Sequence, residues 1–301
     1  MSIITVGFNP TLQKTLVFPS LVPDAVNRCA GYRLDTAGKA LNVSRVLSQL
    51  GKKSIHLTQL GGRHRPVFLE LCAKDGIDIR WAESESEIRF CYTLLDREKH
   101  QFTELVEEGD RAGEGAEAGL LEIFNSLLPD ASALIIAGSK TSGFSDRIIP
   151  EMVKLAKAAA LRIILDIRGA DLLNSLPYRP DIIKPNADEF ASTFAHGDAK
   201  EFSRNKEKTA AQCRAIWESY GCNTILTRGG GGVWYAEAGN FAEFGIDSAQ
   251  AVNTTGSGDA FTAGLVSALS DGALFKEALA EGARCGRLNA LCLKPGTIVD
   301  I

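Results

Sequence analysis

The chain has 301 residues, and 45% of them are hydrophobic, enough for one large α/β domain or two smaller ones. Its 33 basic residues are balanced by 37 acidic ones without any basic run, which argues against a nucleic-acid or membrane-surface role. The start carries no secretory signal and no apolar run approaches membrane-spanning length, so we expect a soluble, cytoplasmic protein with reduced cysteines.

Strand-like and helix-like segments alternate along the chain. This alternation predicts an α/β fold, a mainly parallel sheet with helices on both faces. The expected strands are Ile3–Val6, Ile55–Leu60, Ala133–Ala137, Arg162–Asp166, Asp181–Lys184 and Thr224–Thr227. Apolar residues at helical spacing predict a first helix over Ala40–Leu50. Further helices are expected near 67–75, 115–128, 146–160, 203–220, 259–270 and 275–293.

Two segments interrupt the alternation. Residues 12–36 and 78–108 are β-like, and neither is followed by its own crossover helix. We therefore expect a small sheet, built from two insertions, that lies over one edge of the main domain as a lid. Because such a sheet is thin, one of its faces needs a cover, either the active site or a second subunit.

The run Asn253-Thr254-Thr255-Gly256-Ser257-Gly258-Asp259-Ala260-Phe261 leads from a β-favouring segment into an amphipathic helix. Its small residues let consecutive N–H groups point into one concavity at the positive end of a helix, which is an anion site. A carboxylate there repels a bound phosphate, unless it takes a proton from a hydroxyl that attacks the phosphate. The run therefore indicates phosphoryl transfer to an alcohol with Asp259 as the base. A capping aspartate after a glycine-rich turn is the alternative.

Two other nucleotide-binding motifs are excluded. Phe261 stands where a G-x-G-x-x-G fingerprint needs its third glycine, which argues against a nicotinamide dehydrogenase. A G-x-x-x-x-G-K-[ST] phosphate loop is missing, because Gly38-Lys39 continues with Ala40 and Gly51-Lys52 with Lys53.

Several segments together resemble the ribokinase-like (pfkB) sugar kinases, most closely the branch of 1-phosphofructokinase and tagatose-6-phosphate kinase. The matching segments are Gly7–Pro10, Val26–Arg28, Ala37–Arg45, the K-P-N-x-x-E element Lys184–Glu189, and the run 253–264. The resemblance runs nearly end to end. It implies one ribokinase-like domain over residues 1–301, with three α/β/α layers and the small β-sheet lid. It also implies the use of ATP and Mg²⁺, and a homodimer formed through the lid sheet.

On the nucleotide side, the resemblance assigns roles residue by residue. Asp259 matches the catalytic base, and the N–H groups of Gly256, Ser257 and Gly258 match the hole that stabilises the transferring phosphoryl group. Glu189 matches a residue that positions magnesium through water, with Asn186 beside it; helix capping is the alternative for both. The positions implied for nucleotide binding are Lys184, Asn186, Thr227, Gly229, Gly232 and Asn289. Asn289 is placed near the adenine, with a solvated polar residue as the alternative.

On the acceptor side, the resemblance implies a pocket for a phosphorylated sugar. Its positions are Asn9, Gln13, Gly38, Lys39, Asn42, Arg89 and Ser139. Arg89 matches a lid arginine that holds the phosphate already on the substrate, a task that suits the guanidinium fork. Lys39 lies at a helix start, where a cation opposes the helix dipole, so we expect an anionic partner for it. Glu104 matches a lid residue that we interpret as structural.

The departures from the family pattern all lie on the acceptor side. Gln13 stands where the family branch usually has an aspartate that accepts hydrogen bonds from sugar hydroxyls, and Ala40 stands where it has a glycine. The lid strand 88–93 reads I-R-F-C-Y-T, without the usual amide and second cation. We expect a ketohexose phosphate as acceptor, with fructose 1-phosphate favoured over tagatose 6-phosphate and fructose 6-phosphate. A nucleoside or unphosphorylated sugar kinase and a catalytically silent sugar-phosphate sensor are the alternatives.

Overall fold

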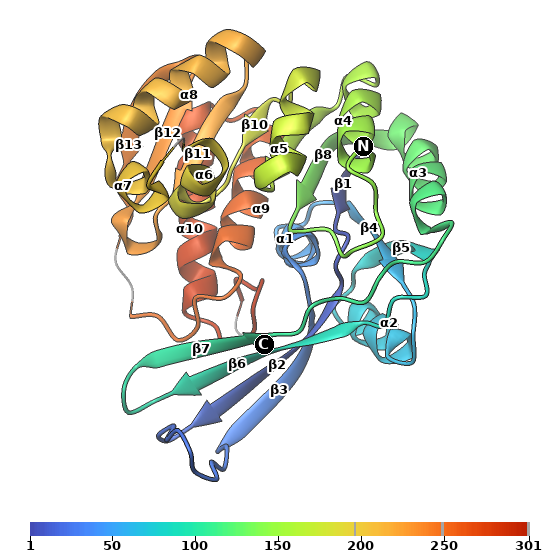
Figure 1. Cartoon of the computed structure of the whole chain (residues 1–301), viewed down its shortest axis with the longest axis vertical. Coiled ribbons are helices and arrows are strands. Elements are labelled where there is room, and N and C mark those ends of the chain that lie inside the picture. Colours follow the sequence, from blue (N-terminus) through green and yellow to red (C-terminus); the bar gives the residue numbers. More distant parts are fainter. Residues whose placement is uncertain (196, 248–249, 300–301) are drawn as a thin grey trace.

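The computed structural model describes residues 1–195, 197–247 and 250–299 (Figure 1). Within these residues, a sheet of nine strands has the order β13-β12-β11-β10-β9-β8-β1-β4-β5. From β5 to β11 in this order the strands are parallel, and β12 and β13 continue the sheet antiparallel. Its strands are β1 (Ser2–Val6), β4 (Ser54–Leu60), β5 (Asp78–Glu83), β8 (Ala131–Ala137), β9 (Arg162–Asp166), β10 (Ile182–Ile183), β11 (Asn223–Thr227), β12 (Val233–Glu237) and β13 (Asn240–Phe244).

Helices cover both faces of this sheet, so the predicted α/β fold is confirmed (Figure 1). One face carries α3 (Ala116–Leu127), α4 (Ile148–Ala158), α5 (Gly169–Ser175), α6 (Ala187–Phe194) and α8 (Lys206–Tyr220). The other face carries α1 (Lys39–Gln49), α9 (Ser257–Ser270) and α10 (Phe275–Ala290). Successive residues of a strand point to opposite faces, so Ile163 and Leu165 join one core while Ile164 joins the other.

The helix boundaries differ from the expected ones where polar residues interrupt the pattern. The predicted helix at 203–220 is divided at Asn205, which ends α7 (Ala199–Arg204). The same side chain accepts a hydrogen bond from the Lys208 N–H and so begins α8. The last predicted helix ends at Ala290 and not at 293. The expected elements do not include α5, β12 or β13, and α6 is foreshadowed only by the helix cap considered for Asn186 and Glu189.

A second sheet of four strands lies beside the main one as the predicted lid (Figure 1). Its order is β3 (Gly31–Ala37), β2 (Thr11–Phe18), β6 (Arg89–Asp96) and β7 (Gln101–Val106), with β2 and β6 parallel at its centre. The expected boundary at residue 78 is corrected. β5 pairs in parallel with β4 at the edge of the main sheet, because Ala82 packs into the core beside α3. The second insertion therefore supplies lid strands only from Arg89 onward.

The parallel strands all end at the same edge of the sheet, and the segments that follow them carry the polar residues of interest. Asp166 ends β9, Lys184 follows β10, and Thr227 ends β11. The α2 helix (Arg65–Lys74) joins the base of the lid to the main sheet through a separate apolar cluster that contains Phe68 and Leu12. None of the described helices is both long and apolar enough to span a bilayer.

Candidate active site

Two adjoining cavities open where the parallel strands end. The smaller, of about 150 Å³, contains Asn9 and Ser139 in its wall. The larger cleft, of about 720 Å³, is lined by the glycine-rich run and by the segments that follow β10 and β11. Gly38, Lys39 and Arg89 belong to both walls. Every site residue predicted from the sequence lines one of these cavities, with the exception of Asn289.

Asp259 lies in the first turn of α9 and is only 6% exposed. The Asn42 amide on α1 donates a hydrogen bond of 2.8 Å to its Oδ2 atom. Burial and the nearby negative charge of Asp166 raise the pKa of Asp259 to about 6, although Lys39, Asn42 and Lys184 act in the opposite direction. The carboxyl is therefore mostly ionised at neutral pH and basic enough to accept a proton.

Asp166 organises the positive charge beside Asp259. Its carboxylate receives the Lys184 ammonium at 2.9 Å and the Lys39 ammonium at 3.2 Å, and it is 2% exposed. Burial would raise the pKa of Asp166, but the two ammonium groups outweigh that effect and lower it. Lys39 also contacts Glu189 at 3.0 Å. The anionic partner expected for Lys39 is thus supplied, at least in part, by the protein itself.

Asp166 is a cleft residue that the sequence analysis missed. The signal was available, because an aspartate that closes a buried parallel strand projects at the edge where such sheets place their ligands. The sequence predicts the strand Arg162–Asp166, and Asp166 is its last residue.

The glycine-rich run forms an anion cradle, but the N–H groups that it offers are not the three that were predicted. Gly256 has a φ of +83°, and a Cβ there would lie 2.5 Å from the Gly296 nitrogen, so only glycine fits. The Ser257 N–H donates to the Thr254 carbonyl at 3.1 Å and is already used. Within the described residues, the N–H groups of Gly256, Gly258 and Asp259 have no protein acceptor. These three are the donors available to an anion.

Asn289 does not line the cleft, although Gly286 and Ala290 on the same helix do, and it is not the solvated residue that was the alternative. Its side chain is fully buried, and its amide donates to the Thr255 carbonyl at 2.9 Å and to Ser257 Oγ at 3.0 Å. Its oxygen accepts the Thr297 N–H at 3.1 Å. With both amide hydrogens and the oxygen engaged, Asn289 supports the cradle from behind.

Asn186 and Glu189 form the helix cap that the sequence offered as the alternative, and both also line the cleft. Asn186 Oδ1 accepts the Glu189 N–H at 2.8 Å, and Glu189 Oε2 accepts the Asn186 N–H at 3.0 Å, which is a capping box at the start of α6. The second oxygen of Glu189 receives Lys39. Because each carboxylate oxygen already has one donor, these residues fit a magnesium ion held through its water molecules better than one bound directly.

The loop after β11 forms another wall of the cleft. Thr227, Gly229 and Gly232 line it as predicted. The Arg228 guanidinium lies over the Trp234 ring, 4.0 Å from its centroid, and so anchors the loop on the sheet. The loop thereby presents glycine backbone, with no side chains, to a bound ligand.

On the acceptor side, Arg89 is the cation with the most unused hydrogen-bonding capacity. Its Nε donates to Thr11 Oγ1 at 3.0 Å and its NH1 to the Glu107 carbonyl at 2.8 Å. The remaining guanidinium N–H donors have no partner among the described residues, and they adjoin both cavities. Gln13 is buried and donates to Thr93 Oγ1 at 2.9 Å, so two of the departures from the family pattern bind each other.

The lid and the anion cradle are in direct contact. Glu104 on β7 accepts a hydrogen bond of 2.8 Å from Thr255 Oγ1, across 151 residues of sequence. Glu104 also lines the cleft. The structural role predicted for Glu104 is therefore to hold the edge of the lid against Thr255, the residue that precedes Gly256.

Comparison with known proteins identifies the family. The sequence model of the pfkB family carbohydrate kinases matches residues 11–300. The chain therefore belongs to the pfkB family of carbohydrate kinases, enzymes that transfer a phosphoryl group to an alcohol.

Solved structures share this fold over nearly the whole chain. Phosphofructokinase-2 from Escherichia coli, in complex with potassium, has a TM-score of 0.84 at 19% identity, covering 97% of this chain and 93% of that one. A protein from Thermotoga maritima described as a possible 1-phosphofructokinase has a TM-score of 0.87 at 20% identity, covering 98% and 93%. Ribokinase from Thermotoga maritima has a TM-score of 0.74 at 19% identity, covering 100% and 96%. These similarities confirm the ribokinase-like fold.

Proposed function

We propose that this pfkB-family chain transfers the γ-phosphoryl group of ATP to a free hydroxyl of a ketohexose phosphate, with fructose 1-phosphate as the favoured acceptor. The observation that carries the proposal is the position of Asp259. It is a buried carboxylate with a raised pKa, in the wall of the larger cleft, beside N–H groups that have no acceptor in the part of the chain that the structure describes. That cleft shares Gly38, Lys39 and Arg89 with the smaller cavity, in which we place the sugar.

The residues divide the chemistry between them. Asp259 accepts the proton of the acceptor hydroxyl while that oxygen bonds to the γ-phosphorus and the bond to the leaving ADP oxygen breaks. The free N–H groups of Gly256 and Gly258 stabilise the charge on the transferring group. The Lys184 ammonium lies just beneath, 3.8 Å from where a Cβ on Gly258 would be, and adds positive charge there.

The charge of the site suits a nucleotide that carries magnesium. Lys39 and Lys184 supply two positive charges, and three carboxylates, Asp166, Glu189 and ionised Asp259, surround them. This net negative charge would repel a polyphosphate that carries no metal ion. Glu189 and Asn186 would hold the ion through its water molecules, and when bound it neutralises the phosphates that separate during transfer.

Arg89 supports a phosphorylated acceptor over a neutral one. It is the cation at the junction of the two cavities whose donors are mostly unused, whereas Lys39 is already paired with carboxylates. Gln13 presents a neutral amide where a carboxylate would repel an acceptor's phosphate. We propose that Gln13 widens acceptance toward acceptors that carry more negative charge, or that lack the diol an aspartate would grip.

A coupled assay of ATP consumption tests the proposal on fructose 1-phosphate, fructose 6-phosphate, tagatose 6-phosphate and free fructose. Fructose 1-phosphate should give the highest kcat/KM, and Asp259→Asn should lose about 10²- to 10⁴-fold in kcat while still binding nucleotide. Arg89→Met should raise KM for phosphorylated acceptors but not for fructose. Lys14→Met is the matched control, because Lys14 is a lid cation that lies over the Tyr32 ring outside both cavities. Binding without turnover across the panel would favour the sugar-phosphate sensor.

Substitution of Gln13 tests its part in acceptor choice. Gln13→Asp introduces a charged acceptor for sugar hydroxyls, and hydrogen bonds to charged groups contribute about 1 kcal/mol more than neutral ones. Turnover of fructose 1-phosphate should therefore rise by about fivefold to tenfold. If it does not rise, residue 13 does not determine which acceptor is used.

We further propose a homodimer formed through the lid sheet. The strand β7 is exposed along its whole length, and Leu105, on the face of the strand opposite to the cleft residues Glu104 and Val106, is 51% exposed. Tyr32 on β3, at the opposite edge of the sheet, is 69% exposed. Apolar side chains gathered on a thin sheet favour a protein partner. Light scattering with size-exclusion chromatography should give twice the 32.3 kDa chain mass, and Leu105→Glu with Tyr32→Glu, two residues on the same face of the sheet, should return the monomer.

A further inference from the structure

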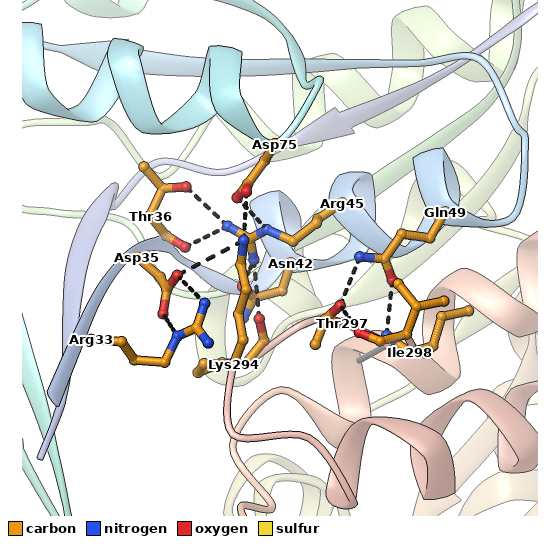
Figure 2. Close-up of polar contacts among 12 residues, drawn as sticks. Arg33, Asp35, Thr36, Asn42, Arg45, Gln49, Asp75, Lys294, Thr297 and Ile298 are labelled. Atoms are coloured by element: carbon orange, nitrogen blue, oxygen red, sulfur yellow. Dashed lines mark hydrogen bonds and ion pairs between the residues drawn. The ribbon is translucent and has the colours of Figure 1, made fainter. Parts of the chain in front are cut away.

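Arg45 is a buried cation of α1 whose hydrogen bonds reach its own helix and three other parts of the chain (Figure 2). It is 1% exposed. Its Nε donates to Asp75 at 2.8 Å, and its NH2 donates to the carbonyl and hydroxyl oxygens of Thr36 at 2.6 and 2.9 Å. Its NH1 donates to the Pro295 carbonyl at 3.1 Å and to Asn42 Oδ1 at 3.0 Å. These five bonds use every donor that a guanidinium has.

The bond to Asn42 has a consequence for the catalytic base. A guanidinium only donates, so Asn42 must turn its oxygen toward Arg45. The Asn42 NH₂ group then faces Asp259, to whose Oδ2 it donates at 2.8 Å. The opposite orientation of the amide would place one oxygen against a carboxylate and two donors against a guanidinium. The Arg45 contact therefore decides which group Asn42 presents to Asp259.

We infer that Arg45 is a positioning residue for phosphoryl transfer: it holds the Asn42 amide so that a donor faces Asp259 Oδ2 and leaves Oδ1 for the acceptor hydroxyl. This inference rests on the proposed role of Asp259 as the base. Arg45 itself lines neither cavity. It acts through Asn42.

The network around Arg45 is built to keep this orientation. Asp75 also receives the Lys294 ammonium, and Lys294 reaches Asp35 at 3.8 Å, while Arg33 holds Asp35 at 2.7 Å (Figure 2). The groups are contributed by β3, by the residue after α2 and by the segment after α10. In this cluster of three cations and two carboxylates the Arg45 guanidinium is held from several sides, so the amide of Asn42 has one favourable orientation.

Other charges also act on Asp259. Asp166 at the end of β9 raises its pKa, whereas Lys39 on α1 and Lys184 after β10 lower it. The donor from Asn42 acts with the two lysines. Loss of that donor should therefore shift the acid limb of kcat/KM to higher pH, a change that a purely structural role of Arg45 would not produce.

The experiment compares the pH profiles of kcat/KM for the full-length enzyme and three variants. Arg45→Lys keeps a positive charge for Asp75 but cannot reach both Asn42 and Thr36. We expect kcat/KM at pH 7 to fall about tenfold to a hundredfold, with the acid limb at higher pH. Asn42→Asp still accepts from Arg45, so it keeps the network, but it presents oxygen to Asp259. It should move the limb further in the same direction.

Gln49→Met is the matched control. Gln49 lies one turn further along α1 and ties the same C-terminal segment by bonding Thr297 at 2.7 Å and the Ile298 N–H at 2.8 Å, away from Asn42 (Figure 2). This variant should lower the melting temperature without moving the limb. If a folded Arg45→Lys enzyme behaves in the same way, Arg45 is structural and the inference is wrong.

Two further outcomes separate this inference from the proposed function. If Arg45→Lys does not fold, Asn42→Asp decides, because an unmoved acid limb in that variant would overturn the inference. When Arg45→Lys is added to Asn42→Ala, it should cost little further activity, since Arg45 acts through Asn42; additive losses would contradict this. If Asp259→Asn retains activity, the proposed function itself fails, whatever the other variants show.

Discussion

Asp259→Asn should make the protein more stable at neutral pH while it removes most of its activity. On folding, the pKa of Asp259 rises from 3.8 to about 6. At pH 7 the carboxyl is ionised in both the folded and the unfolded states, and its ionisation costs the folded state about 3 kcal/mol, at about 1.4 kcal/mol per pH unit. Asparagine is neutral and nearly isosteric, so it removes this cost.

The sign and the pH window follow from the raised pKa. Between pH 3.8 and about 6 the folded protein binds more protons than the unfolded one, so this group's contribution to stability falls as the pH rises. Above about pH 6 the full cost is present. The gain from Asp259→Asn should therefore be up to about 3 kcal/mol at pH 7, and about half of that at pH 5.

Urea denaturation at pH 5 and pH 7 measures the difference in free energy of unfolding between the two proteins, with tryptophan fluorescence as the signal. The slope of this free energy against urea concentration should be the same in both. Asp188→Asn is the control, because Asp188 is an exposed carboxylate in the first turn of α6. It should lose a few tenths of a kcal/mol from the helix dipole and show no gain. If Asp259→Asn is less stable than the native protein at pH 7, the carboxyl is not held ionised at a cost, and the reasoning is refuted.

Three further predictions concern the cradle and the charge of Asp259. Gly256→Ala should lose activity and about 2 to 4 kcal/mol of stability, because it combines a positive φ with a Cβ 2.5 Å from the Gly296 nitrogen. Gly272→Ala has nearly the same φ, +85°, with open space around it, and should lose only about 1 kcal/mol; equal losses would contradict the steric account. In the native enzyme, kcat/KM should fall about tenfold from pH 7 to pH 5, as Asp259 becomes protonated. Asp166→Asn should move this limb to lower pH, because the negative charge of Asp166 raises the pKa of Asp259, and an unmoved limb would be evidence against their coupling.

Local sequence patterns predicted the elements and much of the site. The apolar spacing in α1 and α9 predicted those helices, and the glycine-rich run located the anion cradle at the start of α9. The lid was predicted from β-like segments without crossover helices, but β5 was assigned to it wrongly. A short strand carries no sign of which sheet it will join, because that depends on the partner, here β4.

The outcome for Asn289 shows the same limit within the site. A polar residue on an exposed helix and one in a buried network look alike in a sequence, and only the packing of α10 against α9 makes Asn289 a support of the cradle. Its three hydrogen bonds reach segments that precede and follow it in the chain. Whether a buried amide finds hydrogen-bond partners depends on which segments the folded chain brings around it, so the sequence does not show it.

By itself, the sequence determined the α/β class, the family and the carboxylate that follows the Gly-Ser-Gly turn, because each depends on short local patterns and on their order along the chain. The tertiary structure decided which charges meet that carboxylate. Lys39 and Asp166 are 127 residues apart, and Asn42 and Asp259 are 217 apart. They come together because parallel strands end at one edge of the sheet and because α1 packs beside α9. The basicity of Asp259 and its support by Arg45 follow from that packing.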